Sequence, residues 1–204
     1  MARSLLLFHS ALPQKTDDWF HRVSALHLGQ VPCQAGCSAC CIGTFPITLL
    51  DVRSLREGLT RLPATRRERI EETAQIQRSL LAATYPTLSD NPFVDSWSDE
   101  NIDQLVEQYG HLRCPALGDD DLCSLYEFRP LACRSMGIPI EQDGAVAGAC
   151  HVQTFVPITR MTTVLRTEEA TLARQEGKAL ELERKATGAG GDEVLLPYGF
   201  LPLS

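Results

Sequence analysis

The sequence predicts a mainly α-helical fold: a single helical domain, residues 1–204, with a short β-hairpin and cross-links formed by clustered cysteines. Three observations lead to this class. Apolar residues recur at helical spacing in several segments. Two short runs flank a turn rich in glycine and aspartate, as in a hairpin. Eight cysteines are concentrated in two regions, 33–41 and 114–150, that lie far apart along the chain.

Length and composition fit a soluble globular chain with one core. The chain has 204 residues, of which 44% are hydrophobic and 22% are charged. Its formal net charge of −7 argues against a nucleic-acid-binding protein that works through a broad basic surface. No apolar stretch approaches the roughly 20 residues of a membrane span, and the apolar run 5–8 is too short for a signal peptide. We therefore expect a cytoplasmic protein without nucleic-acid or membrane partners.

The first expected helix spans residues 16–29. Thr16 can cap it, and Asp17 and Asp18 follow at the end where the helix dipole favours negative charge. A glycine and a proline end the pattern just before the first cysteine. The buried face of this helix is supplied by apolar residues at helical spacing: Trp19, Phe20, Val23 and Leu26.

The segment 33–41 contains four of the eight cysteines, spaced Cys-x3-Cys-x2-Cys-Cys. Thiolates that converge from one tight loop are the ligands that a soft metal ion or an iron–sulfur cluster requires. Buried thiols or a disulfide knot are the alternative. Cys40 and Cys41 are adjacent, however, and poorly placed to bridge each other. In a reducing cytosol such a pattern indicates a metal-binding or catalytic role. The lone helical histidines His21 and His27 are not expected to be ligands.

A second helix follows the cysteine loop. Thr48 and Asp51 form the signature of a capping box at its start, and Pro63 stops it. Apolar residues then recur at helical spacing on one face: Val52, Leu55, Leu59 and Leu62.

Two more helices precede the second cysteine block. Thr65 with Glu68 is expected to cap a helix that reaches about Thr84, with a charged, solvated face and a buried face of Ile70, Ala74, Leu80 and Leu81. After a loop at 85–97, Ser98 caps a helix that Gly110 closes, with Ile102, Leu105, Val106 and Tyr109 turned inward.

The second cysteine block runs from residue 114 to residue 134. Short runs on both sides of a glycine–aspartate turn predict a hairpin with Cys114 and Cys123 on opposite strands. Pro130 suits the first turn of a short helix. Cys133 then lies near the amino-terminal end of that helix, where a thiolate is favoured.

Positive charge accompanies this block. Arg129 and Arg134 are expected either to offset the negative charge of several thiolates or simply to pair with acidic residues. Cys150, followed by His151, ends the cysteine series. A last helix is predicted from Thr167 to about Lys185, and the apolar tail 194–203 is expected to pack back on the domain.

The cysteine blocks together resemble the YkgJ-type cysteine-cluster family, which is described as zinc- or iron-chelating. The resemblance covers about residues 30–151 and implies a metal centre held by the cysteines of the motif. A similar cluster occurs in flagellin lysine N-methylase, where it is held to be an iron–sulfur cluster. The matching motifs are Cys33-x3-Cys37-x2-Cys40-Cys41, Cys114-Pro115-x-Leu117 and Cys123-Ser124-Leu125-Tyr126-x2-Arg129-Pro130-x2-Cys133-Arg134.

The candidate ligands are therefore all eight cysteines, and their number leaves the kind of centre open. Eight thiols suit two four-cysteine zinc sites. They equally suit one four-thiolate iron–sulfur cluster with four thiols left over. The full set is Cys33, Cys37, Cys40, Cys41, Cys114, Cys123, Cys133 and Cys150.

Two functional classes remain after these arguments. The first is a metal-binding protein whose zinc or iron centre holds a helical domain together, or stores or senses metal. The second is an enzyme, either a protein methylase by analogy with the flagellin enzyme or a radical S-adenosylmethionine enzyme, whose three-cysteine spacing is matched by Cys33, Cys37 and Cys40. The residues do not identify a catalytic group, a substrate or a protein partner. Such radical enzymes are built on a βα-barrel, whose alternation of strands and helices is missing from this pattern.

Overall fold

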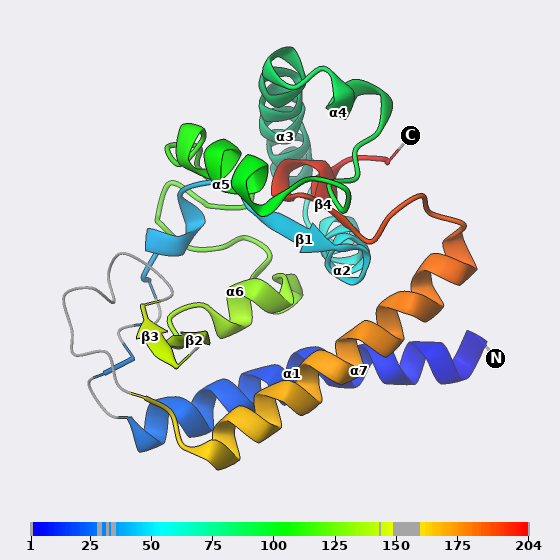
Figure 1. Cartoon of the computed structure of the whole chain (residues 1–204). Coiled ribbons are helices and arrows are strands. Elements are labelled where there is room, and N and C mark those ends of the chain that lie inside the picture. The colour runs from blue at the N-terminus through cyan, green and yellow to red at the C-terminus, as the bar shows by residue number, and fades with distance from the viewer. Residues whose placement is uncertain are drawn as a thin grey trace. The chain divides into compact units, whose positions relative to one another are not determined.

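The computed structural model describes residues 2–27, 30–31, 33, 36–142, 144–148 and 160–203, the side chains of 2–10 and 142 excepted. It confirms a mainly helical chain with little strand (Figure 1). The elements are α1 (Ala2–Leu26), η1 (Ala39–Cys41), β1 (Pro46–Thr48), α2 (Leu49–Arg61), α3 (Ala64–Thr84), α4 (Thr87–Asp90), α5 (Asp99–Gln108), η2 (Tyr126–Phe128), α6 (Leu131–Ser135), β2 (Ile140–Gln142), β3 (Ala145–Ala147), α7 (Thr163–Thr187), β4 (Glu193–Leu195) and η4 (Leu196–Phe200).

Contacts divide the chain into two compact units. Unit 1 consists of Met1–Cys40 and Leu131–Leu182, and unit 2 of Cys41–Pro130 and Glu183–Ser204. Each unit therefore uses two stretches of chain, and the boundary in the first cysteine block falls between neighbouring cysteines. That the whole chain forms one domain stays a prediction. None of the helices in the described part is long and apolar enough to cross a membrane.

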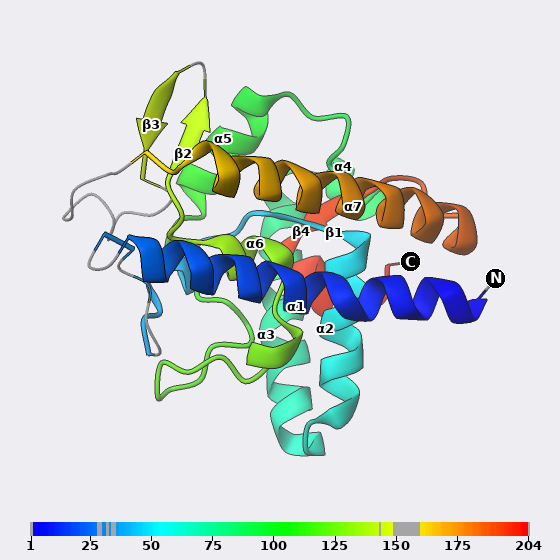
Figure 2. The ribbon, with the colours of Figure 1, turned by 90° about the horizontal axis from the view of Figure 1, so that it is seen from below.

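Unit 1 is built on two long helices, α1 and α7, which lie side by side (Figures 1 and 2). The indole Nε1 of Trp19 donates a hydrogen bond to the carbonyl oxygen of Leu165, 3.1 Å away. Trp19 is 1% exposed and Val23 is fully buried, and they form a small core with Ile138, Met161 and Leu165. The stripe predicted at 19–26 therefore does supply a buried face, although Leu26 is 67% exposed.

The first helix is longer than the sequence indicates. It begins at Ala2, not near Thr16, and continues through Pro13 to Leu26. Thr16 is buried inside the helix, and its hydroxyl donates to the carbonyl oxygen of Leu12 at 3.0 Å, so it does not act as the N-cap. A threonine followed by two aspartates has the composition of a helix start, but here a preceding turn already supplies the carbonyl that this hydroxyl needs.

In unit 2, helix α2 starts with the cap that the sequence predicts. The Thr48 hydroxyl accepts a hydrogen bond from Asp51 N, and the Asp51 carboxylate accepts one from Thr48 N, so the predicted capping box is present. α2 ends at Arg61, two residues before Pro63. Its buried face includes Val52, Leu55 and Leu59.

The tail packs into unit 2, as predicted. β4 pairs antiparallel with β1, with Pro46 opposite Leu195 and Thr48 opposite Glu193. Residues 194–196 and 198, 200 and 201 are all buried in a core shared with α2, α3 and α5. The Tyr198 hydroxyl lies 3.5 Å from the Leu88 carbonyl oxygen, its acceptor. The chain therefore closes the core of unit 2 with its last described segment.

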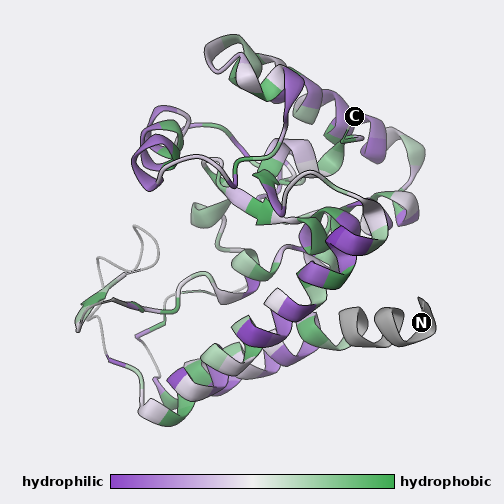
Figure 3. Ribbon diagram, turned by 45° about the vertical axis from the view of Figure 1, so that its right-hand side comes forward, coloured by the Kyte–Doolittle hydropathy of each residue, from purple (hydrophilic) through white to green (hydrophobic). Residues whose placement is uncertain are grey.

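The predicted helices around that core are present with small differences. α3 starts at Ala64 with Pro63 before it and no side-chain cap, so Thr65 is not the cap. Leu80 is 43% exposed and does not belong to the buried face, where Gln77 lies instead. The Ser98 hydroxyl caps α5 by accepting from Asn101 N. Figure 3 shows hydrophilic and hydrophobic segments alternating along the long helices, as expected for helices with one buried face.

Acidic side chains gather where β4 starts. The Asp95 carboxylate accepts hydrogen bonds from the backbone N–H groups of Asp192 (2.7 Å) and Glu193 (3.3 Å). Partial burial and then the charges of Asp95, Asp192 and Asp51 raise the pKa of the Glu193 carboxyl. This end of the strand is consequently sensitive to pH.

Candidate metal centre

Seven of the eight predicted ligands lie in the described part of the chain, and each is half-buried. The eighth, Cys150, lies outside the described residues, as does the neighbouring His151. No two of the described cysteines are at disulfide distance. In unit 1 the described cysteines are Cys33, Cys37, Cys40 and Cys133, and in unit 2 they are Cys41, Cys114 and Cys123.

In unit 1, Cys33 contacts the turn that follows α6. Its thiol donates a hydrogen bond to the carbonyl oxygen of Met136 at 3.2 Å. α6 carries Cys133, three residues before Met136. The two cysteines are separated by 100 residues in sequence, and this contact brings Cys33 to the segment that directly follows Cys133.

Arg134, next to Cys133, anchors α6 to α1. Its side chain is 3% exposed and forms an ion pair with the Asp17 carboxylate, which is 20% exposed. Of the two roles that the sequence allows for this arginine, the structure therefore shows pairing with an acidic residue. Arg129 places its guanidinium 3.9 Å from the centre of the Tyr126 ring and donates to the Tyr126 carbonyl oxygen at 2.9 Å.

In unit 2, the end of the first cysteine block pairs with the start of the second. Ile42 and Arg113 form an antiparallel bridge, and the N–H of Cys114 donates to the carbonyl oxygen of Cys41 at 2.7 Å. The backbones of two cysteines 73 positions apart are thus directly hydrogen-bonded. Gly43 N donates to Leu112 O at 2.6 Å and extends the pairing.

The predicted hairpin of the second block is present as a tight turn. Leu117 and Cys123 form an antiparallel bridge, and Gly118 N donates to Leu122 O at 2.8 Å. Asp121 at the tip has a φ of 58°, and the Asp120 carboxylate accepts from Leu122 N at 3.1 Å. The aspartates thus shape the turn. Cys123 lies opposite Leu117, so the hairpin does not place it directly across from Cys114.

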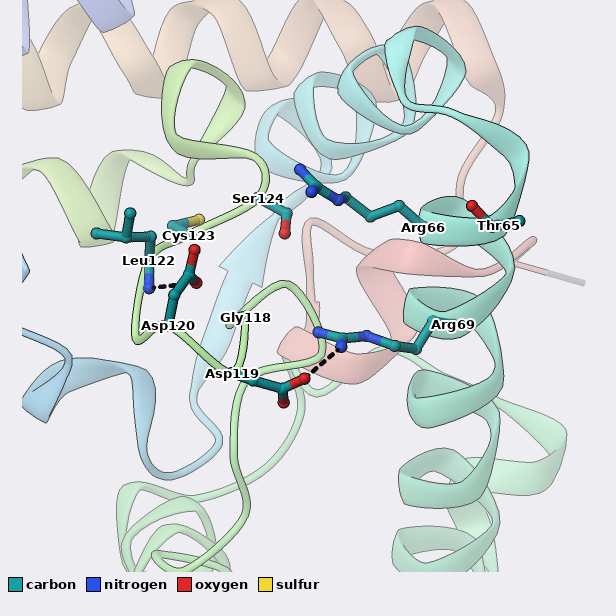
Figure 4. Close-up of a pocket in the computed structure, with 9 residues that line it drawn as sticks. All are labelled: Thr65, Arg66, Arg69, Gly118, Asp119, Asp120, Leu122, Cys123 and Ser124. Carbon is teal, nitrogen blue, oxygen red and sulfur yellow. Dashed lines mark hydrogen bonds and ion pairs between the residues drawn. The ribbon is translucent and has the colours of Figure 1, made fainter.

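A pocket of about 620 Å³ lies beside this turn (Figure 4). Arg66 and Arg69 of α3 line one side, and the turn with Cys123 and Ser124 lines the other. Arg69 forms an ion pair with Asp119, with 3.0 Å between Nη1 and Oδ2. Cys123 is therefore next to a space that a solute can enter. Neither arginine is marked by the cysteine motif, so the sequence gives no reason to place them here.

The described cysteines are suitable donors for a metal ion, but their side chains do not meet at one point in this structure. Among them, no three histidine, cysteine, aspartate or glutamate side chains are grouped closely enough to hold a metal ion. The fit to a metal therefore rests on the chemistry of the donor set, because half-buried thiols suit zinc, iron or an iron–sulfur cluster. His27, which we expect not to be a ligand, has a buried Nε2 without a hydrogen-bond partner within the described residues.

A protein-family model matches residues 32–151 of the chain. The model is named CxxCxxCC and is described as a "Putative zinc- or iron-chelating domain". The chain belongs to this family. The match covers both cysteine blocks and confirms the cysteine-cluster resemblance on which the predicted ligands rest. No curated protein and no solved structure matches the chain.

One detail separates this chain from the pattern spelled by the CxxCxxCC name. Three residues, not two, stand between Cys33 and Cys37. The last of them, Gly36, has a φ of +85°, a conformation that glycine adopts readily and that other residues rarely do.

Proposed function

We propose that this CxxCxxCC protein binds zinc or iron through cysteine thiolates, and that the bound metal stabilises its fold. The observation that carries the proposal is the family match over residues 32–151, which contains all eight cysteines. Half-burial of the seven described thiols and the lack of disulfide distances among them support it further. Thiolate binding of this kind contributes directly to the free energy of folding.

The identity of the metal is tested by its content and colour. Protein made in rich medium and purified without oxygen should contain zinc or iron at near-integral stoichiometry. A brown protein bleached by dithionite would select an iron–sulfur cluster, and a colourless protein with zinc would select a structural zinc site. Only traces of any transition metal, in anaerobic and reducing preparations alike, would refute the proposal.

The ligands are tested by two substitutions in unit 1. Cys37→Ser and Cys133→Ser should each release metal and lower the unfolding temperature, because both thiols are proposed to bind in one centre. Ser135→Ala is the matched control: it lies on α6 two residues after Cys133, and its hydroxyl donates to the helix carbonyls of Leu131 and Ala132, both at 3.3 Å. If Cys133→Ser keeps its full metal content, Cys133 is only a packed thiol.

An enzyme is the second candidate, and the pocket beside Cys123 is the observation that favours it. A catalytic centre keeps one coordination position open, whereas a structural thiolate centre is closed. Metal-loaded protein, with cobalt in place of colourless zinc, is titrated with S-adenosylmethionine and with small anions. We expect no spectral change and metal loss only on unfolding. Saturable binding with the fold intact would select the enzyme.

A further inference from the structure

The turn after α6 leaves a space that the sulfur of Cys33 fills. Ile138 N donates to Ser135 O at 3.1 Å and closes the turn, and Gly137 is its third residue with a φ of +89°. This is the position where a type II turn requires glycine. A Cβ at Gly137 would lie less than 3.0 Å from Cys33 Sγ and 3.3 Å from Cys33 Cβ. Real Cβ atoms essentially never approach a sulfur that closely, so a side chain at 137 and the Cys33 sulfur cannot both occupy this space.

Both sides of this contact are anchored in the core of unit 1. Ile138, directly after Gly137, is 3% exposed and packs with Trp19 and Leu165. Val31, two residues before Cys33, packs against the same core. The backbone on the Gly137 side therefore cannot retreat at low cost, because well-packed interiors resist displacement. The thiol is the part that can move.

We infer that Gly137 positions the sulfur of Cys33 for metal binding. This inference rests on the proposed function. A side chain at 137 would turn the Cys33 thiol to another rotamer and move the sulfur by about 3 Å. The fold tolerates that movement, but a metal–sulfur bond of about 2.3 Å does not. Gly137 is thus a positioning residue that acts through Cys33, whose thiol also donates a hydrogen bond to the Met136 carbonyl oxygen.

The first test compares two alanine substitutions at glycines with similar backbone conformations. Gly144 also lies in a turn of unit 1 and has a φ of +80°, but nothing lies within 4 Å of a Cβ built there. Gly137→Ala should weaken metal binding about 10–100-fold, the range for residues that orient ligands. Gly144→Ala should bind like the wild type. Zinc content and the cobalt–thiolate absorption of each protein are measured, with circular dichroism to follow the fold.

A double-mutant cycle separates the thiol contact from backbone strain. Cys33→Ala removes the sulfur that a side chain at 137 would displace. In that background, Gly137→Ala should change metal affinity no more than Gly144→Ala does. If Gly137→Ala has the same effect with and without Cys33, its role is confined to the backbone and the inference is overturned. Gly137→Asn is the second variant, because asparagine tolerates a positive φ while still adding a Cβ.

A measurement without metal completes the test. N-ethylmaleimide is added to metal-free protein, and the labelling of Cys33 is followed by mass spectrometry of its peptide. Gly137→Ala should expose the thiol and speed this labelling several-fold, and an unchanged rate would overturn the inference. If the wild type binds metal and Gly137→Ala binds it equally well, the inference fails while the proposed function stands. If the wild type binds no metal, the proposed function fails, and the metal-binding role of Gly137 with it.

Discussion

Asp17→Asn is the substitution whose effect follows most directly from the structure. The Asp17 carboxylate pairs with Arg134, whose side chain is 3% exposed, and the pair joins α1 to α6. Asparagine keeps the size of the side chain and removes its charge. The guanidinium then stays in the interior without the opposite charge of Asp17, which is the costly way to break a buried pair.

The expected loss can be estimated from burial. Breaking a buried ion pair by removing one partner costs roughly 3–5 kcal/mol. The Asp17 side chain is 20% exposed, and the amide oxygen of asparagine can still accept a hydrogen bond. We therefore expect the lower end of this range, about 3 kcal/mol. At about 2–4 °C per kcal/mol for a chain of this size, the unfolding temperature should fall by roughly 6–12 °C.

The neighbouring residue provides the control. Asp18 is exposed, and its carboxylate accepts a hydrogen bond from the Gln14 side chain at 2.9 Å. Asp18→Asn removes the same charge from the same helix and should change stability by less than about 0.5 kcal/mol. Thermal and urea unfolding of metal-free protein give both values. If the two variants unfold alike, the pair with Arg134 does not hold α6 to α1 and the reasoning is wrong.

Three further predictions concern Gly58 and Glu193 of unit 2 and Gly177 of α7. Gly58→Ala should destabilise by about 1–3 kcal/mol through overpacking, because its Cβ would lie 2.7 Å from the Phe128 ring. Gly177→Ala, with nothing within 4 Å, should stabilise by about 0.5–1 kcal/mol; urea unfolding that ranks them in the opposite order would refute both. Folding raises the pKa of the Glu193 carboxyl. Between the unfolded-state and folded-state pKa values, the folded protein therefore binds more protons than the unfolded chain. The free energy of unfolding consequently falls as the pH rises through this range. Glu193→Gln should therefore stabilise more at pH 7 than at pH 4, and an equal gain at both would contradict this.

Helix starts were predictable where the signal is local. The Thr48–Asp51 capping box needs only four consecutive residues, and the structure contains it. The signal at Thr16 is equally local but occurs inside a longer helix, where it has no capping role. A local capping pattern predicts that a helix can start at a residue, but it does not show whether a longer helix already runs through that residue.

The sheet of unit 2 was not predictable in the same way. β1 and β4 are three residues each, too short for an alternating pattern, and Pro46 pairs with Leu195 from the other end of the chain. Strand pairs of this kind are decided by tertiary packing. The tail was expected to pack on the domain because it is apolar, but its apolar residues do not predict that it pairs with β1.

The candidate metal centre was also only partly predictable from the sequence. Thiol density predicted a ligand set of eight cysteines, which stays a prediction, and the family match covers the residues that contain them. Sequence could not show that Cys33 lies against Gly137, because glycine in a sequence carries no sign of what fills the space beside it. Nor could it separate the described cysteines between two units, since Cys40 and Cys41 are neighbours in the chain.

The closing of unit 2 by its last described segment has a consequence for the order of synthesis. β4 emerges from the ribosome 147 residues after its partner β1, roughly 7–30 s later at common elongation rates. Every residue of unit 1 has been made by then, since that unit ends at Leu182. Cys114 and Cys123, which pack against the core of unit 2, are therefore synthesised well before the strand that completes this core.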